Sequence, residues 1–190
     1  KVADAFAELD PLICYSVKCN GNTHICRLLR REGAGFDVVS GGELYRAVQA
    51  GGDPGKMVYA GVGKTDAEIK QALDAGLGLF NIESEQELAT IESIACERHR
   101  PARGLLRVNP DVDPRTHRHT TPGQQETKFG VDIERAEEIF IKYSKSEYLH
   151  LCGVHIHLGS PINSTGPYVE GIRKVLDLIG RLRDKGLTID

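Results

Sequence analysis

The stretch ICYSVKCNGN, residues 13–22, decides the fold, because it sets one lysine in a run that otherwise reads as a buried strand. With the two-residue period of a strand, Cys14, Ser16 and Lys18 share one face. Lys18 falls near the end of the run, and enzymes built from parallel strands place their sites at the carboxyl ends of those strands. The stretch therefore predicts a barrel strand with Lys18 on its inner, polar side.

The rest of the chain repeats this pattern of one strand followed by one helix. Short apolar runs occupy residues 13–19, 36–40, 57–61, 77–83, 102–110 and 149–158. Stretches with helical periodicity occupy residues 23–33, 42–51, 65–76, 84–100, 133–146 and 168–186. Regular alternation of this kind is typical of parallel strands joined by covering helices.

Two α/β architectures fit such a repeat. A doubly wound sheet is expected to show G-x-G-x-x-G after its first strand, and no such motif follows residues 13–19. We therefore predict a (β/α)8 TIM-type barrel. It is incomplete, with about six β-α units and the start of a seventh strand at LTID, residues 187–190, whereas a closed barrel typically takes about 250 residues.

Polar residues recur at the ends of the expected strands, on the face that Lys18 shares. Asp37 and Arg107 occupy this parity in their strands, and so do His155 and His157 in residues 149–158. A lysine buried in such a barrel would have a lowered pKa and a nucleophilic amine, as a Schiff base requires. An ion pair with Asp37 or Glu43 is the alternative reading.

Composition narrows the classes of partner. The net charge of −3, with both signs interspersed, argues against nucleic acid and anionic membranes and favours a small polar substrate. No run approaches a membrane span of about 18 apolar residues, and no signal peptide is recognisable, so we expect a cytoplasmic protein. The five cysteines show no metal-type spacing, and neither a disulfide framework nor a metal site is expected.

Several stretches, in order along the chain, resemble the pyridoxal-phosphate-dependent decarboxylases of the alanine-racemase barrel type, and among them the diaminopimelate decarboxylases. They are YSVKCN (15–20), GFDVVSGGEL (35–44), LRVNPDVDPRTH (106–117), KFGVDI (128–133) and GVHIHLGSPI (153–162). The resemblance spans nearly the whole chain. It implies pyridoxal 5'-phosphate as the cofactor and a small amino acid as the substrate.

The same resemblance assigns roles to individual residues. Lys18 matches the lysine that forms the Schiff base with the cofactor, and His157 matches the histidine that stacks on its ring. Ser160 matches a ligand of the cofactor phosphate, while Asp37 and Arg107 match polar residues of the cofactor pocket. His155 lies deeper and is expected to be a hydrogen-bonded interior histidine.

The resemblance further implies decarboxylation of meso-diaminopimelate to L-lysine and carbon dioxide. Arginine, ornithine or carboxynorspermidine remain alternative substrates, and a barrel that binds pyridoxal phosphate without turnover is a third possibility. Residues 1–190 would form one cofactor-binding barrel domain without the family's C-terminal β-domain, so this piece alone is expected to be inactive. The full-length protein is expected to be a homodimer.

The sequence also departs from the family pattern. Cys19 stands after the lysine where alanine is usual, and Pro161 stands after Gly159-Ser160 where glutamine is common. Because proline has no backbone N–H, the expected phosphate turn loses one donor. The polar segment 111–132 has no clear period and is expected to be a loop over the barrel mouth.

Overall fold

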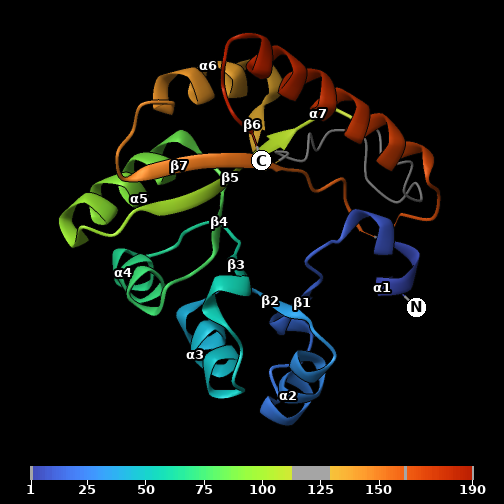
Figure 1. Ribbon diagram of the computed structural model, residues 1–190, viewed down its shortest axis with the longest axis vertical. Helices are drawn as coiled ribbons and strands as arrows, with labels where there is room; N and C mark the ends of the chain where they lie inside the picture. The colour runs from blue at the N-terminus through green and yellow to red at the C-terminus, as the bar shows by residue number, and fades with distance from the viewer. Residues whose placement is uncertain (1, 113–128, 161, 190) are drawn as a thin grey trace, which may run out of the picture.

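The computed structural model describes residues 2–112, 129–160 and 162–189, and it confirms the expected incomplete barrel. Figure 1 shows the strands in an arc, with helices covering its outer side. Six parallel strands follow one another in the order β1-β2-β3-β4-β5-β7, and a short strand, β6, pairs with β5 as well. The sheet does not close among the described residues, because β1 and β7 lie at its two ends.

The elements follow the expected alternation closely. The strands are β1 (Cys14–Ser16), β2 (Gly35–Val38), β3 (Met57–Tyr59), β4 (Leu79–Ile82), β5 (Ala102–Asn109), β6 (Val131–Asp132) and β7 (Leu149–His155). The α-helices are α1 (Val2–Ala5), α2 (Thr23–Arg31), α3 (Gly41–Gln49), α4 (Asp66–Ala75), α5 (Glu85–Arg98), α6 (Ile133–Tyr143) and α7 (Gly166–Asp184). Three short 3-10 helices are η1 (Ala7–Leu9), η2 (Val17–Cys19) and η3 (Pro54–Lys56).

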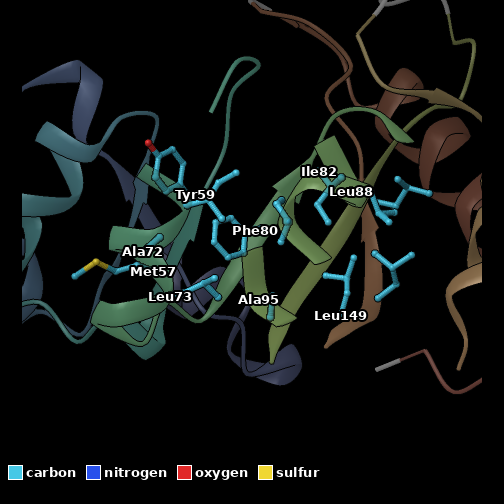
Figure 2. Packing of buried hydrophobic residues seen from close by; sticks show 14 of the residues in the cluster. Met57, Tyr59, Ala72, Leu73, Phe80, Ile82, Leu88, Ala95 and Leu149 are labelled. Atoms are coloured by element: carbon cyan, nitrogen blue, oxygen red, sulfur yellow. The ribbon is translucent and has the colours of Figure 1, made fainter. Parts of the chain in front are cut away.

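The core lies between the strands and their covering helices. Alternate strand residues such as Phe36, Tyr59, Phe80 and Ile82 turn outward and are at most 1% exposed. They pack against helix residues, as Figure 2 shows for Ala72 and Leu73 of α4, Leu88 and Ala95 of α5. The side chains of the other parity point to the inner side of the arc, so polar groups there are free to form a site.

The three helices that follow β2, β3 and β4 begin with the same type of N-terminal cap. The hydroxyls of Ser40, Thr65 and Ser84 accept hydrogen bonds from the backbone N–H groups of Glu43, Glu68 and Glu87. Each cap fixes the start of the helix that follows one of these strands. The carboxyl ends of β2, β3 and β4 are therefore held in defined positions.

The structure differs from the sequence prediction in three places. β1 ends at Ser16, and the chain turns into η2, so Lys18 does not belong to the strand. Residues 187–189 contain no strand, although Ile189 is buried, so the expected seventh strand does not begin there. Segment 111–132 ends in β6, which pairs with β5; residues 113–128 of the expected loop lie outside the described residues.

β7 carries an irregularity that the sequence pattern does not show. Gly104 pairs with Leu151, but the next residue, Leu105, pairs with Gly153, so Cys152 is an extra residue in β7. Such a bulge reverses the side-chain parity beyond it. Arg107 and His155 become direct partners across the two strands. None of the helices in the described part of the chain is both long and apolar enough to cross a bilayer.

Candidate active site

Lys18 lies on a turn at the carboxyl end of β1. Its neighbour Val17 is 1% exposed and anchors the turn in the core, while Lys18 itself is exposed. The backbone N–H of Asn22 donates to the side chain of Asn20 at 3.0 Å, and the side chain of Asn22 caps α2 by accepting from His24. The turn is therefore fixed at both ends, and Lys18 projects from it.

This position corrects the prediction of a buried strand lysine. Lys18 is exposed, so desolvation does not explain its chemistry. Among the residues that the structure describes, none forms a hydrogen bond or an ion pair with its ammonium group, which also removes the alternative of a pair with Asp37 or Glu43. The amine is free to react because it is accessible and has no partner there.

Asp37 lies on the inner side of β2, next to β1. Ser16 and Asp37 are paired in the strand register, and the Ser16 hydroxyl donates to the Asp37 carboxylate at 2.8 Å. Both residues are half-buried. Ser16 is two residues before Lys18, so this carboxylate is held beside the strand end from which the lysine turn begins.

Arg107 belongs to a row of polar side chains across three neighbouring strands. Glu83 directly follows β4, Arg107 lies on β5, and His155 ends β7. Arg107 donates from Nη1 to Oε2 of Glu83 at 2.7 Å; the two side chains are 14% and 4% exposed. The sequence analysis found Arg107 and His155 by strand parity but missed Glu83, whose place at the end of residues 77–83 was the available signal.

His155 occupies the other end of this row. Burial and the neighbouring Arg107 charge lower its pKa to about 4, although Glu83 acts in the opposite direction. Its Nδ1 is buried and has no hydrogen-bond partner in the described part of the chain. The prediction of a hydrogen-bonded interior histidine is therefore wrong for this nitrogen, and the imidazole is neutral near pH 7.

His157 and Ser160 lie beyond the end of β7 and are both exposed. His157 is close enough for its charge to lower the pKa of His155, so it lies near the polar row. Gly159, before Ser160, has a φ of +120°, which favours glycine. The turn therefore presents an accessible hydroxyl and an accessible imidazole at the mouth. Because β7 ends at His155, the strand parity predicted from the sequence does not extend to His157.

Phe129 and Gly130 lie against the outer end of Arg107. The Arg107 guanidinium carbon is 5.6 Å from the centre of the Phe129 ring. A Cβ on Gly130 would lie 2.9 Å from the Arg107 carbonyl oxygen, and the φ of Gly130 is +100°. Phe129 and Gly130 therefore pack directly on Arg107.

A second lysine near the mouth, Lys64, is buried, whereas Lys18 is not. Lys64, in the connection between β3 and α4, has a side chain that is 1% exposed. Its ammonium group donates to the carbonyls of Gly61 and Asn81, each at 2.8 Å, and to Glu87 at 2.5 Å. Three acceptors thus surround its ammonium group and satisfy its hydrogen-bonding capacity. The sequence analysis missed it, because a lysine in a polar loop gives no sign of burial.

These side chains fit the cofactor that the sequence predicts. An accessible, unpartnered amine suits the aldehyde of pyridoxal phosphate, and the Ser160 hydroxyl beside Gly159 suits its phosphate. An exposed imidazole, a fixed carboxylate and a fixed guanidinium surround the same mouth. The described residues contain no group of three or more His, Cys, Asp or Glu side chains that could hold a metal ion.

Comparison with known proteins gives a consistent result. A family model described as "Pyridoxal-dependent decarboxylase, pyridoxal binding domain" matches residues 1–190. A diaminopimelate decarboxylase of Aquifex aeolicus (strain VF5) is 49% identical over 180 residues, which cover 95% of this chain and 43% of the relative. The Helicobacter pylori diaminopimelate decarboxylase, solved with L-lysine, has a TM-score of 0.86 at 40% identity, over 94% of this chain and 45% of that chain.

More distant structures share the fold alone. An arginine decarboxylase of a Paramecium bursaria Chlorella virus has a TM-score of 0.78 at 21% identity, covering 98% of this chain and 48% of that chain. The present chain thus spans less than half the length of the relatives that it matches. Its match to the family model extends from the first residue to the last. The chain belongs to the pyridoxal-dependent decarboxylases, and it matches the model of their pyridoxal-binding domain.

Proposed function

We propose that the complete protein containing this chain decarboxylates meso-diaminopimelate to L-lysine and carbon dioxide, with pyridoxal 5'-phosphate held in the barrel mouth. The observation that carries the proposal is the free ammonium group of Lys18 at the carboxyl end of β1. Relatives named diaminopimelate decarboxylase that are 40–49% identical support this substrate over arginine, whose decarboxylase is 21% identical.

Each residue of the mouth has a task in this proposal. Lys18 would hold the cofactor through its aldehyde. Ser160 and the backbone at Gly159 would hold its phosphate, and His157 would orient its ring. Asp37 and Arg107 provide fixed charges beside it, one of each sign. When bound, the cofactor supplies the electron sink that accepts the electron pair left by carbon dioxide.

The experiment is a comparison of substrates. The complete protein, loaded with pyridoxal phosphate, is incubated separately with meso-diaminopimelate, arginine and ornithine, and release of carbon dioxide and of the product amine is measured. We expect carbon dioxide and L-lysine from meso-diaminopimelate at the highest kcat/KM. A preference for arginine or ornithine would contradict the proposed substrate. A protein that binds the cofactor but releases no carbon dioxide would contradict the proposed activity.

We further propose that the complete protein is a cytoplasmic homodimer that binds no nucleic acid. The family resemblance supports the dimer, and the net charge of −3 argues against a nucleic-acid partner. Residues 1–190 would be its cofactor-binding barrel domain, followed by a C-terminal β-domain. Sedimentation of the complete protein at several concentrations tests the dimer, and a monomer at all of them would contradict it.

A further inference from the structure

Glu83 is a buried carboxylate at the mouth to which the proposed function gives no task. Its side chain is 4% exposed, and its Oε1 is buried without a partner among the described residues. Burying a carboxylate is costly unless it is paired. Its counter-charge is Arg107, at 2.7 Å, so any role of Glu83 acts through that guanidinium.

The backbone of Glu83 is itself held firmly. Its N–H donates to Oε2 of Glu87 at 3.0 Å, and Oε1 of the same carboxylate accepts from the buried Lys64. The N–H of Glu87 is capped in turn by Ser84. These hydrogen bonds connect Glu83 to the start of α5 and to the loop before α4. Glu83 therefore has a fixed position from which its carboxylate can orient a neighbouring side chain.

Arg107 is also confined from its other sides. Phe129 covers the guanidinium, and Gly130 lies so close to the Arg107 carbonyl that no Cβ fits there without a shift. In the strand register its partner on β7 is His155, which is neutral near pH 7 and offers no charge to attract it. The ion pair with Glu83 is therefore the specific interaction that sets the direction of the guanidinium.

We propose that Glu83 is a positioning residue, which fixes Arg107 in the orientation that pyridoxal phosphate requires at the mouth. This inference rests on the proposed function for the identity of the cofactor. A free arginine side chain must lose rotamer freedom when a ligand binds, and a partner that orders it beforehand removes that cost. Glu83 does not touch the cofactor, and its effect disappears when Arg107 is absent.

The test is a double-mutant cycle in the complete protein, with Glu83→Ala, Arg107→Ala and the double variant. The readout is the dissociation constant for pyridoxal phosphate, measured by absorbance on the cofactor-free protein. We expect Glu83→Ala alone to raise the constant by about three- to tenfold, which is the cost of ordering one long side chain on binding. In the Arg107→Ala background the same change should have no further effect.

Glu83→Gln provides a second variant that keeps an acceptor for Arg107. We expect it to fold, to weaken binding less than Glu83→Ala does, and to shift the pH at which the bound cofactor changes colour. Glu97→Gln, on the exposed surface, is the matched control and should bind like the unmodified protein. Additive effects of Glu83→Ala and Arg107→Ala would overturn the inference, as would unchanged binding in a folded Glu83→Ala variant.

The readouts separate this inference from the proposed function. If the unmodified protein fails to bind pyridoxal phosphate, the proposed function fails, and the cycle is then measured on the free energy of unfolding of the cofactor-free protein. Coupling between Glu83 and Arg107 in that measurement supports the positioning contact, and its absence contradicts it. If the protein binds the cofactor but the cycle shows no coupling, only the positioning role is lost.

Discussion

Lys18 and Lys64 both follow a strand of the same barrel, yet their surroundings are opposite. Lys18 is exposed on a turn after β1 and has no partner in the described part of the chain. Lys64 follows β3 with a side chain that is 1% exposed and bonds to two carbonyls and a carboxylate. The comparison teaches that an apolar sequence context does not predict burial: the lysine proposed to react is exposed, and the buried lysine has the contacts of a structural group.

The largest expected effect comes from Lys18→Met. Because Lys18 is exposed and forms no hydrogen bond or ion pair among the described residues, the free energy of unfolding of the variant should lie within about 0.5 kcal/mol of that of the unmodified protein. It should nevertheless lose covalent cofactor, visible as loss of the absorption band, together with carbon dioxide release. A coloured and active Lys18→Met protein would break the comparison.

Lys64→Met should show the reverse behaviour. Removing one partner of a buried ion pair leaves Glu87 and two carbonyls unsatisfied, so the free energy of unfolding should fall by about 3–5 kcal/mol. Urea unfolding of the cofactor-free protein measures this change. At a temperature where the variant stays folded, borohydride should still attach the cofactor to it. If Lys64→Met were as stable as the unmodified protein, the buried ion pair of Lys64 and Glu87 would make no contribution to stability.

His155 and His157 also differ in their surroundings, because His155 is half-buried and His157 is exposed. The pKa of His155 is lowered to about 4, below its unfolded value of about 6.5, so between these pH values the unfolded chain binds a proton that the folded chain does not. Stability should therefore fall by up to about 3 kcal/mol as pH drops through this window. His155→Gln should lack this dependence, and an identical pH profile of stability in both proteins would contradict it.

The smallest effect is expected at the exposed pair of Lys70 and Glu97. Their ionic groups lie 3.0 Å apart, but the side chains are 38% and 59% exposed. Water and salt screen such a pair, so Lys70→Met should change the free energy of unfolding by less than about 1 kcal/mol. A loss as large as that of Lys64→Met would mean that burial does not distinguish the two pairs.

The sequence predicted the architecture because the period of its apolar residues and the caps of its helices are local signals. The helices expected at residues 65–76 and 84–100 are α4 and α5 within two residues at each end. The strand register is not local, and the extra residue Cys152 in β7 shifts the faces beyond it. Strand parity placed Arg107 and His155 correctly on the inner side of the arc. The strands predicted from the sequence were too long, however, because β1 ends before Lys18 and β7 ends before His157.

Burial of individual charges was the part that sequence could not supply. Lys18 sits in an apolar run and is exposed, whereas Lys64 sits in the polar stretch GVGKTDAE and is buried by the ends of β3 and β4 and by α5. The role of Glu83 becomes visible only through its ion pair with Arg107 on the next strand. Ion pairs of this kind join residues that are far apart in the sequence. Which of these residues meet depends on the tertiary structure, and local sequence patterns do not predict it.

The most direct test of the account is to locate the cofactor on the chain. The complete protein is loaded with pyridoxal phosphate, reduced with borohydride and digested, and the modified peptide is identified by mass spectrometry. The account predicts that the modification lies on Lys18 and that Lys64 remains unmodified. A cofactor attached to Lys64, or to no lysine in a protein that binds it, would contradict the central claim.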